Sequence, residues 1–159
     1  MNNPPPQLFV LPEDDANRHL AQGFKLYYAV DTRKIKILPI AGGWMKVLDK
    51  FTQDQVGDML RYPRRTMILL IDFDERVRLP YARGRIPDEL RERVFILGTR
   101  DDPEDLEKKL KIGSLEDIGR ALARDCHEHS GEVWNHPQLT HNDAEVNRLS
   151  AAVRSWLFP

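Results

Sequence analysis

Two groups of acidic residues in this sequence each lie close after a short apolar segment. Glu13–Asp15 follows Leu8–Leu11, and Asp72–Glu75 follows Met67–Ile71. Carboxylates that converge in a poorly solvated place repel each other, and either protonation or a bound cation relieves the repulsion. Mg²⁺ prefers oxygen ligands and commonly binds one or two protein carboxylates. The two groups therefore predict a divalent-metal site, with Mg²⁺ or Mn²⁺ as the cofactor.

The segments before these acids are predicted to be buried strands. Thr66–Ile71 shows no polar alternation, which is typical of a central parallel strand covered on both faces. Further strands are predicted at 34–40 and 93–97. Helices are predicted at 16–28, 44–51, 52–60, 87–92, from 102 onward, 114–127 and 142–157. Ser114…Asp117 and Asn142…Glu145 resemble capping boxes at the starts of the last two. Strands separated by helices indicate an α/β fold, an open and mainly parallel four-stranded Rossmann-like sheet with helices on both faces and extra C-terminal helices.

The composition is that of a folded globular protein, with 41% hydrophobic and 31% charged residues among 159. We expect a Pro-rich disordered tail at 1–7 and one domain at 8–159, of which 114–159 is helical. The longest aliphatic segment is too short to span a membrane, the N-terminus lacks signal-peptide features, and one cysteine excludes an internal disulfide. These features predict a cytoplasmic protein without a membrane partner.

The spacing of the acids suggests how they would be arranged. Along an extended chain Asp72 and Asp74 point the same way, and Phe73 turns toward the core. In open α/β sheets ligands bind beyond the carboxyl ends of the strands, so Glu13 would join this pair if the first and third strands are neighbours. The alternative is structural, because an aspartate after a strand is often a turn residue or, like Asp14 or Asp15, a helix cap.

Three segments together resemble the Toprim domain of topoisomerases, primases and the overcoming-lysogenisation-defect nucleases. They are Phe9–Glu13, Leu38–Gly43 and Leu69–Asp74, within a match from about Leu8 to Leu106. The family has a glutamate after its first strand, a glycine near the end of its second, and a DxD pair after its third.

The resemblance implies a Toprim-like fold and phosphodiester chemistry on DNA or RNA, as in a nuclease. It implies that Glu13 is the general acid/base or a metal ligand, and that Asp72 and Asp74 hold Mg²⁺. Asp14 and Glu104 are secondary metal candidates. The chain departs from the family in having Pro12 before the glutamate, two aspartates after it, and no lysine in the segment after Asp74.

Arginine is concentrated near the second acidic group. The net charge of −1 excludes binding of nucleic acid through gross positive charge, so any contact needs a local basic patch. A predicted loop over 76–85 would hold phosphates, with Tyr81 available to stack on a base, although its arginines could equally pair with acids. Gly42 and Gly43 would admit a phosphate to a helix N-terminus. The arginines concerned are Arg76, Arg78, Arg83 and Arg85.

One cysteine and four histidines cluster in the C-terminal part of the sequence. Paired spacing typical of structural zinc is absent, so a helix-end loop is the simpler interpretation, and metal binding stays open. The residues are Cys126, His127, His129, His136 and His141.

Two further functions remain open. A receiver-like signalling domain would use Asp72 as phospho-acceptor, with Thr99 after the fourth strand, but no lysine follows a recognisable fifth strand. A catalytically silent module would bind a protein partner or a second copy of the chain, and the missing lysine favours it. A haloacid-dehalogenase phosphatase is disfavoured because its DxD follows the first strand of the domain.

Overall fold

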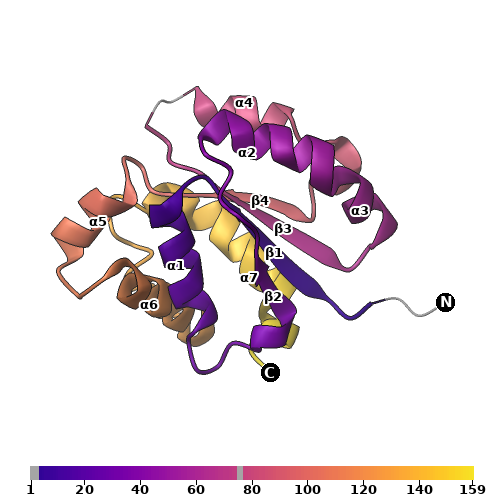
Figure 1. Cartoon of the computed structure of the whole chain (residues 1–159). Coiled ribbons are helices and arrows are strands. Elements are labelled where there is room, and N and C mark those ends of the chain that lie inside the picture. Colours follow the sequence, from indigo (N-terminus) through magenta and orange to yellow (C-terminus); the bar gives the residue numbers. More distant parts are fainter. Residues whose placement is uncertain (1–3, 75–76) are drawn as a thin grey trace.

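The computed structural model describes residues 4–74 and 77–159, and in these residues it has one four-stranded parallel sheet. Its order is β2-β1-β3-β4, so the first and third strands are neighbours (Figure 1). The predicted open parallel α/β fold is therefore confirmed. The strands are β1 (Gln7–Pro12), β2 (Ile35–Ile37), β3 (Arg65–Leu70) and β4 (Val94–Leu97).

Helices cover both faces of the sheet. One face packs against α2 (Trp44–Lys50), a π-helical turn (Phe51–Gln55), α3 (Val56–Arg61) and α4 (Arg78–Gly84). The other face packs against α1 (Asp15–Lys25), α6 (Leu115–Glu128) and α7 (Asp143–Leu157), and α5 (Pro103–Leu110) packs outside α1 and α6. Three 3₁₀ turns span Thr32–Lys34, Asp88–Leu90 and Thr140–Asn142.

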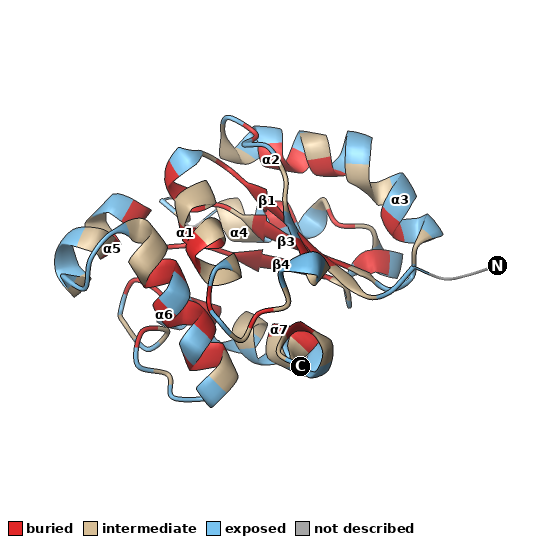
Figure 2. Cartoon of the chain, turned by 60° about the horizontal axis from the view of Figure 1, so that its bottom comes forward, coloured by how far each residue is buried: buried red, intermediate tan, exposed pale blue. Residues whose placement is uncertain are grey.

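The alternation of side chains along the strands divides the core into two layers. Phe9 and Met67 pack toward α2 and α3, whereas Leu8 and Ile68 pack toward α1 and α7. Figure 2 shows β1 and β3 buried along most of their length, with the exposed residues on the outer sides of the helices. Apolar residues at successive positions, as in β3, are therefore what a strand covered on both faces requires.

Two glycines bring α1 and α6 close together. A Cβ atom on Gly23 would lie 2.0 Å from the carbonyl oxygen of Glu116, and one on Gly119 would lie 2.1 Å from that of Leu20. Since neither position has room for a side chain, this contact requires glycine on both helices. It fixes α1, whose first turn follows Glu13, against the rest of the protein.

The outer edge of β4 is covered by side chains from the start of α7. The Asn142 amide donates to the Gly98 carbonyl at 2.9 Å, Glu145 accepts from the Ile96 N–H at 3.0 Å, and Arg148 donates to the Val94 carbonyl at 3.1 Å. These three residues recur every third position and so lie along one side of the helix. The predicted Asn142…Glu145 capping box is wrong, because both side chains bond to the sheet.

Two other local predictions are also wrong. Thr52 does not open a new helix, because its hydroxyl donates to the Leu48 carbonyl at 2.9 Å within a continuous helical segment. The segment predicted as a loop over 76–85 is helical from Arg78 to Gly84, the bounds of α4. Pro80 is tolerated there because it lies in the first turn, where backbone N–H groups have no partner within the helix.

Other boundaries agree with the sequence to within a few residues. Pro103 lies at the start of α5, and Ser114 and Asp117 form the predicted capping box of α6. The second strand is shorter than 34–40, since it pairs with β1 only at Ile35–Ile37. Within the described ranges, no helix combines the length and the apolar character that crossing a lipid bilayer needs.

Candidate metal centre

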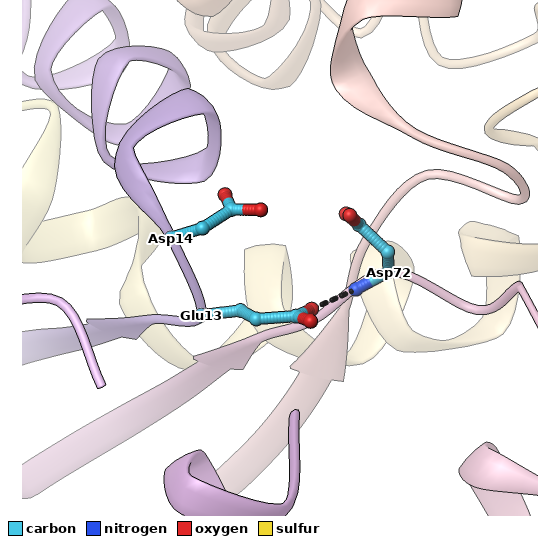
Figure 3. Close-up of side chains that lie close together, drawn as sticks. All are labelled: Glu13, Asp14 and Asp72. Atoms are coloured by element: carbon cyan, nitrogen blue, oxygen red, sulfur yellow. Dashed lines mark hydrogen bonds between the residues drawn. The ribbon is translucent and has the colours of Figure 1, made fainter. Parts of the chain in front are cut away.

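The two acidic segments meet at the carboxyl ends of β1 and β3. The Glu13 N–H donates to the Leu70 carbonyl at 2.9 Å, which extends the pairing of β1 and β3 by one residue. The Asp72 N–H donates to Glu13 Oε2 at 2.8 Å, so the side chain from one strand end is fixed by the backbone of the other (Figure 3). Parallel pairing in this register therefore places both acids at one point of the sheet edge.

Three carboxylates converge at this point: Glu13, Asp14 and Asp72. Each offers an oxygen that lies within 4.8 Å of the corresponding oxygens of the other two. Glu13 is 8% exposed and Asp72 is 6% exposed. Figure 3 shows Asp14 and Asp72 facing each other above Glu13. The sequence predicted Glu13 and Asp72 in this group and named Asp14 as a secondary candidate.

Asp14 has two roles at once. Its Oδ1 accepts the backbone N–H of Asn17 at 3.0 Å and so caps the N-terminus of α1. The same carboxylate also belongs to the acidic group. Capping and metal binding, which the sequence presents as alternatives, are therefore compatible at this residue.

Asn17 connects the two aspartates. Its side-chain amide donates to Asp14 Oδ1 at 2.9 Å and to Asp72 Oδ1 at 3.0 Å, and the residue is fully buried. Within the part of the chain that the structure describes, its Oδ1 has no hydrogen-bond partner. An amide that donates both hydrogens to carboxylates holds them at a fixed separation, so Asn17 is a positioning residue of this site.

In each of the three carboxylates, one oxygen accepts hydrogen bonds and the other is available to a cation. The engaged atoms are Glu13 Oε2, Asp14 Oδ1 and Asp72 Oδ1, the last of which also accepts the Thr99 hydroxyl at 3.4 Å. Among residues 4–74 and 77–159, the second oxygen of each of these three side chains makes no hydrogen bond. Three available anionic oxygens in close proximity are a suitable donor set for a hard divalent cation.

Burial and like charges shift the protonation of this group. The pKa of Asp72 is raised to about 7. Burial is the largest cause, the Asn17 hydrogen bond opposes it, and the carboxylates of Glu13, Asp14 and Asp74 add to it. Burial also raises the pKa of Glu13, while its hydrogen bond from the Asp72 N–H lowers it. Near neutral pH Asp72 is thus protonated in part of the molecules, and a bound cation would displace that proton.

Asp74, predicted as a metal ligand beside Asp72, lies outside the group of three. Its side chain is 49% exposed, and its Oδ2 lies 3.6 Å from Arg78 Nη1. The same Arg78 nitrogen donates to the Asp72 backbone carbonyl at 3.0 Å. Phe73 packs toward the core as predicted, but the chain bends at Asp74, whose side chain lies near Arg78 of α4 and not beside the Asp72 carboxylate.

The predicted phosphate-binding residues are separated in the structure. Arg78 adjoins the acids, Arg85 pairs with Asp49 at 3.1 Å, Arg83 is exposed near the β4 edge, and Arg76 lies outside the described residues. Glu104 is exposed on α5, outside the group of three.

The two glycines before α2 support Glu13 instead of offering free donors. The N–H groups of Gly42 and Gly43 both donate to the backbone carbonyl of Glu13, at 2.8 and 3.2 Å. Their φ angles of +95° and +147° are strained for residues with a side chain. The structure therefore gives these residues a role in holding Glu13, and their amides are not available to a phosphate.

The histidines and the cysteine near the C-terminus do not form a cluster. His127 contacts Tyr27 and Phe158, His141 contacts Phe73, and Cys126 is buried. Among the described residues, the acidic group is the one set of three or more potential ligands close enough to share an ion.

Comparison with protein-family models, curated proteins and solved structures gives no match to this chain. The geometry of the site is therefore the main indication of its function.

Asn17 is the site residue that the sequence did not indicate. It lies three residues after the N-cap Asp14, where nothing in the sequence distinguishes it, and only the fold brings Asp72 to it. Thr99 was noted only as following the fourth strand, yet its hydroxyl lies at hydrogen-bonding distance from Asp72 Oδ1. Its position after the fourth predicted strand is the signal in the sequence that could have placed Thr99 at this edge of the sheet.

Proposed function

We propose that this protein binds Mg²⁺ or Mn²⁺ through Glu13, Asp14 and Asp72 and acts on phosphodiester bonds of nucleic acid. The observation that supports this most is that carboxylates from two neighbouring strand ends converge, each with one oxygen not engaged in a hydrogen bond. Without a cation this arrangement is electrostatically unfavourable. The resemblance of the same segments to the Toprim domain suggests the class of reaction.

A bound divalent cation would supply charge neutralisation and would polarise a phosphoryl oxygen. The protein's own contribution begins with rigid placement, because the Gly42 and Gly43 amides hold the Glu13 backbone and Asn17 holds the two aspartates. Small displacements of reacting groups lower rates strongly, so such placement matters for catalysis.

Glu13 is the candidate general acid/base. Burial raises the pKa of its carboxyl group, which brings it nearer to the value at which a group both accepts and donates a proton efficiently. Its Oε2 accepts the Asp72 N–H, so Oε1 is the atom left either to bind the cation or to exchange a proton, and it would do the latter where Asp14 and Asp72 hold the ion. Arg78, which also attracts the Glu13 charge, is placed to stabilise negative charge at the same edge of the sheet.

The test uses purified protein with DNA and RNA substrates in Mg²⁺, in Mn²⁺ and in chelator. We expect metal-dependent cleavage by the wild type, and loss of both cleavage and calorimetric metal binding in Asp72→Asn. The matched control is Asp88→Asn, which removes a carboxylate that is 89% exposed and pairs with Arg91. Metal binding or cleavage that is unchanged in Asp72→Asn would exclude the proposal, and metal binding without cleavage would favour the silent binding module.

A second candidate, a receiver-like phospho-acceptor, has one observation in its favour. The Thr99 hydroxyl lies after β4 and donates to the Asp72 carboxylate. In such a reaction an Asp72 oxygen would attack the phosphorus of acetyl phosphate, and acetate would leave. The edge of β4, where a fifth strand would pair, is instead covered by α7, which disfavours this candidate. Intact mass after incubation with acetyl phosphate distinguishes the two.

A further inference from the structure

An exposed aromatic pair lies beside the acidic group. Trp44 is the first residue of α2, and Tyr81 lies in α4, the neighbouring helix on the same face of the sheet (Figure 1). Their ring centroids are 5.7 Å apart with the planes at 80°, an edge-to-face contact. Trp44 packs partly against the core, whereas Tyr81 is 47% exposed. The pair thus has one anchored ring and one ring open to solvent.

Cationic side chains surround this pair. The Arg78 guanidinium lies 5.1 Å from the centre of the Trp44 ring, and Arg85, which follows α4, pairs with Asp49 at 3.1 Å. Lys46 is exposed on α2 and approaches the Gly42 backbone. Aromatic rings interleaved with arginine and lysine are typical of surfaces that bind single-stranded nucleic acid, where rings stack on bases and cations attract phosphates.

Arg78 links the aromatic pair to the acidic group. The same guanidinium that covers Trp44 donates to the Asp72 backbone carbonyl at 3.0 Å and lies 3.6 Å from Asp74 Oδ2. One side chain therefore separates the rings from the proposed metal ligands. A strand with a phosphate at the carboxylates would have a neighbouring base within reach of Tyr81.

We propose that Trp44 and Tyr81 form a stacking platform for an unpaired base, so that the substrate is single-stranded or locally unpaired nucleic acid. This inference rests on the proposed function and names the substrate class of the same site. In a duplex the faces of the bases are covered by neighbouring bases, and stacking on a protein ring requires that a base leave the helix. Tyr81 provides the exposed face, and the edge-to-face contact with Trp44 fixes its position.

The charged side chains around Trp44 and Tyr81 favour a nucleic-acid strand over an apolar protein segment as the ligand of this surface. An apolar peptide would cover Val77 and Met45, which are 64% and 37% exposed, but would offer no anionic group to the exposed ammonium of Lys46. A nucleic-acid strand provides both a π face and phosphates. Since the carboxylates repel phosphate, binding at this place is expected to require a divalent cation.

The experiment measures fluorescence anisotropy of three labelled probes in the presence of Ca²⁺, chosen to limit cleavage. The probes are a single-stranded oligonucleotide, an abasic strand of equal length and charge, and the corresponding duplex. The variants are Tyr81→Ala, Tyr81→Phe, which keeps the ring, and Val77→Ala, which changes an exposed side chain four residues earlier. Thermal unfolding followed by circular dichroism verifies that each variant is folded.

We expect Tyr81→Ala to weaken binding of the single strand by about tenfold or more, the loss typical of one base–aromatic stack. Tyr81→Phe and Val77→Ala are expected to bind like the wild type, and the abasic strand to bind weakly to all variants. Equal weakening of the abasic strand, a duplex bound as tightly as the single strand, or an unchanged affinity in Tyr81→Ala would each overturn the platform.

The outcome also separates this inference from the proposed function. If Asp72→Asn abolishes metal-dependent cleavage while Tyr81→Ala binds and cleaves normally, the platform is wrong and the proposed function stands. If base-dependent binding is lost in Tyr81→Ala but no variant cleaves in Mg²⁺ or Mn²⁺, the platform stands and the phosphodiester activity is wrong.

Discussion

Two buried aspartates in this protein have opposite surroundings. Asp125, 2% exposed in α6, accepts hydrogen bonds from the Ser130 hydroxyl and from the backbone N–H groups of Val133 and Trp134. Asp72, 6% exposed at the end of β3, accepts both of its side-chain hydrogen bonds on one oxygen and faces other carboxylates.

The difference separates a structural carboxylate from a functional one. At Asp125 both oxygens are engaged, and the negative charge is offset by donors that hold residues 130–134 against α6. At Asp72 the folded protein leaves one oxygen available and adds repulsion from its neighbours. A buried acid is thus informative about function when its hydrogen bonds and its charge are not balanced within the protein.

The largest expected effect on stability comes from Asp125→Asn, and the same substitution at Asp72 provides the comparison. Asp125→Asn should lower the free energy of unfolding by roughly 3 kcal/mol, because it replaces an acceptor of charge-assisted hydrogen bonds with a group that is partly a donor. Asp72→Asn in chelator should cost less or stabilise, since it removes a repelled charge. Urea unfolding measures both. Equal losses of unfolding free energy in the two variants would contradict the distinction between a structural and a functional carboxylate.

Metal addition should stabilise the wild type through the acidic group. At a Mg²⁺ concentration about a hundredfold above its dissociation constant, the free energy of unfolding should rise by about 2.7 kcal/mol. The increase should disappear in Asp72→Asn and persist in Asp125→Asn and Asp88→Asn. Thermal unfolding with and without chelator is the measurement. A similar increase in all variants would mean that the ion binds elsewhere.

The pH dependence of stability should differ between the wild type and Asp72→Asn. The pKa of Asp72 is about 7 in the folded protein, above the ordinary value of about 3.9 in an unfolded chain. The folded state therefore binds more protons between these values, and stability falls as pH rises from about 4 to about 7. Relative to Asp72→Asn in chelator, we expect a loss of the order of 2 kcal/mol over that range. Denaturation at several pH values tests this, and parallel curves would contradict it.

The smallest expected effect concerns Asp74. Its half-exposed carboxylate forms an ion pair with Arg78, so Asp74→Asn should change stability by less than about 1 kcal/mol. Calorimetric metal affinity should fall far less than in Asp72→Asn, because Asp74 lies outside the group of three. A comparable loss of affinity in both variants would restore Asp74 as a ligand.

The sequence was sufficient for the sheet and for two members of the site. An uninterrupted apolar segment such as Thr66–Ile71 is explained by burial on both faces, and the parallel arrangement brings the ends of β1 and β3 together. Glu13 and Asp72 could be placed at one edge by this argument alone. Strand periodicity, which is local in sequence, is enough for this placement.

The remaining features depend on contacts that are distant in sequence. Alternation put Asp74 beside Asp72, but the described chain leaves the sheet after Phe73, whose N–H bonds to the Thr99 carbonyl. Asn142 and Glu145 have the spacing of a capping box, yet the fold offers them β4 as a stronger alternative. Asn17 joins the site only through a residue 55 positions away. In each case the local sequence allows more than one partner for the side chain, and the tertiary structure decides which one it contacts.

The position of α7 along β4 also affects how the protein behaves among its own copies. A strand with open N–H and C=O groups can pair with a strand of another molecule, which is a route to association and fibre formation. Here Asn142, Glu145 and Arg148 occupy those groups on the outer side of the sheet. The C-terminal helix therefore protects the β4 edge from intermolecular strand pairing, and its loss would leave the N–H and C=O groups of that edge open to a strand of another molecule.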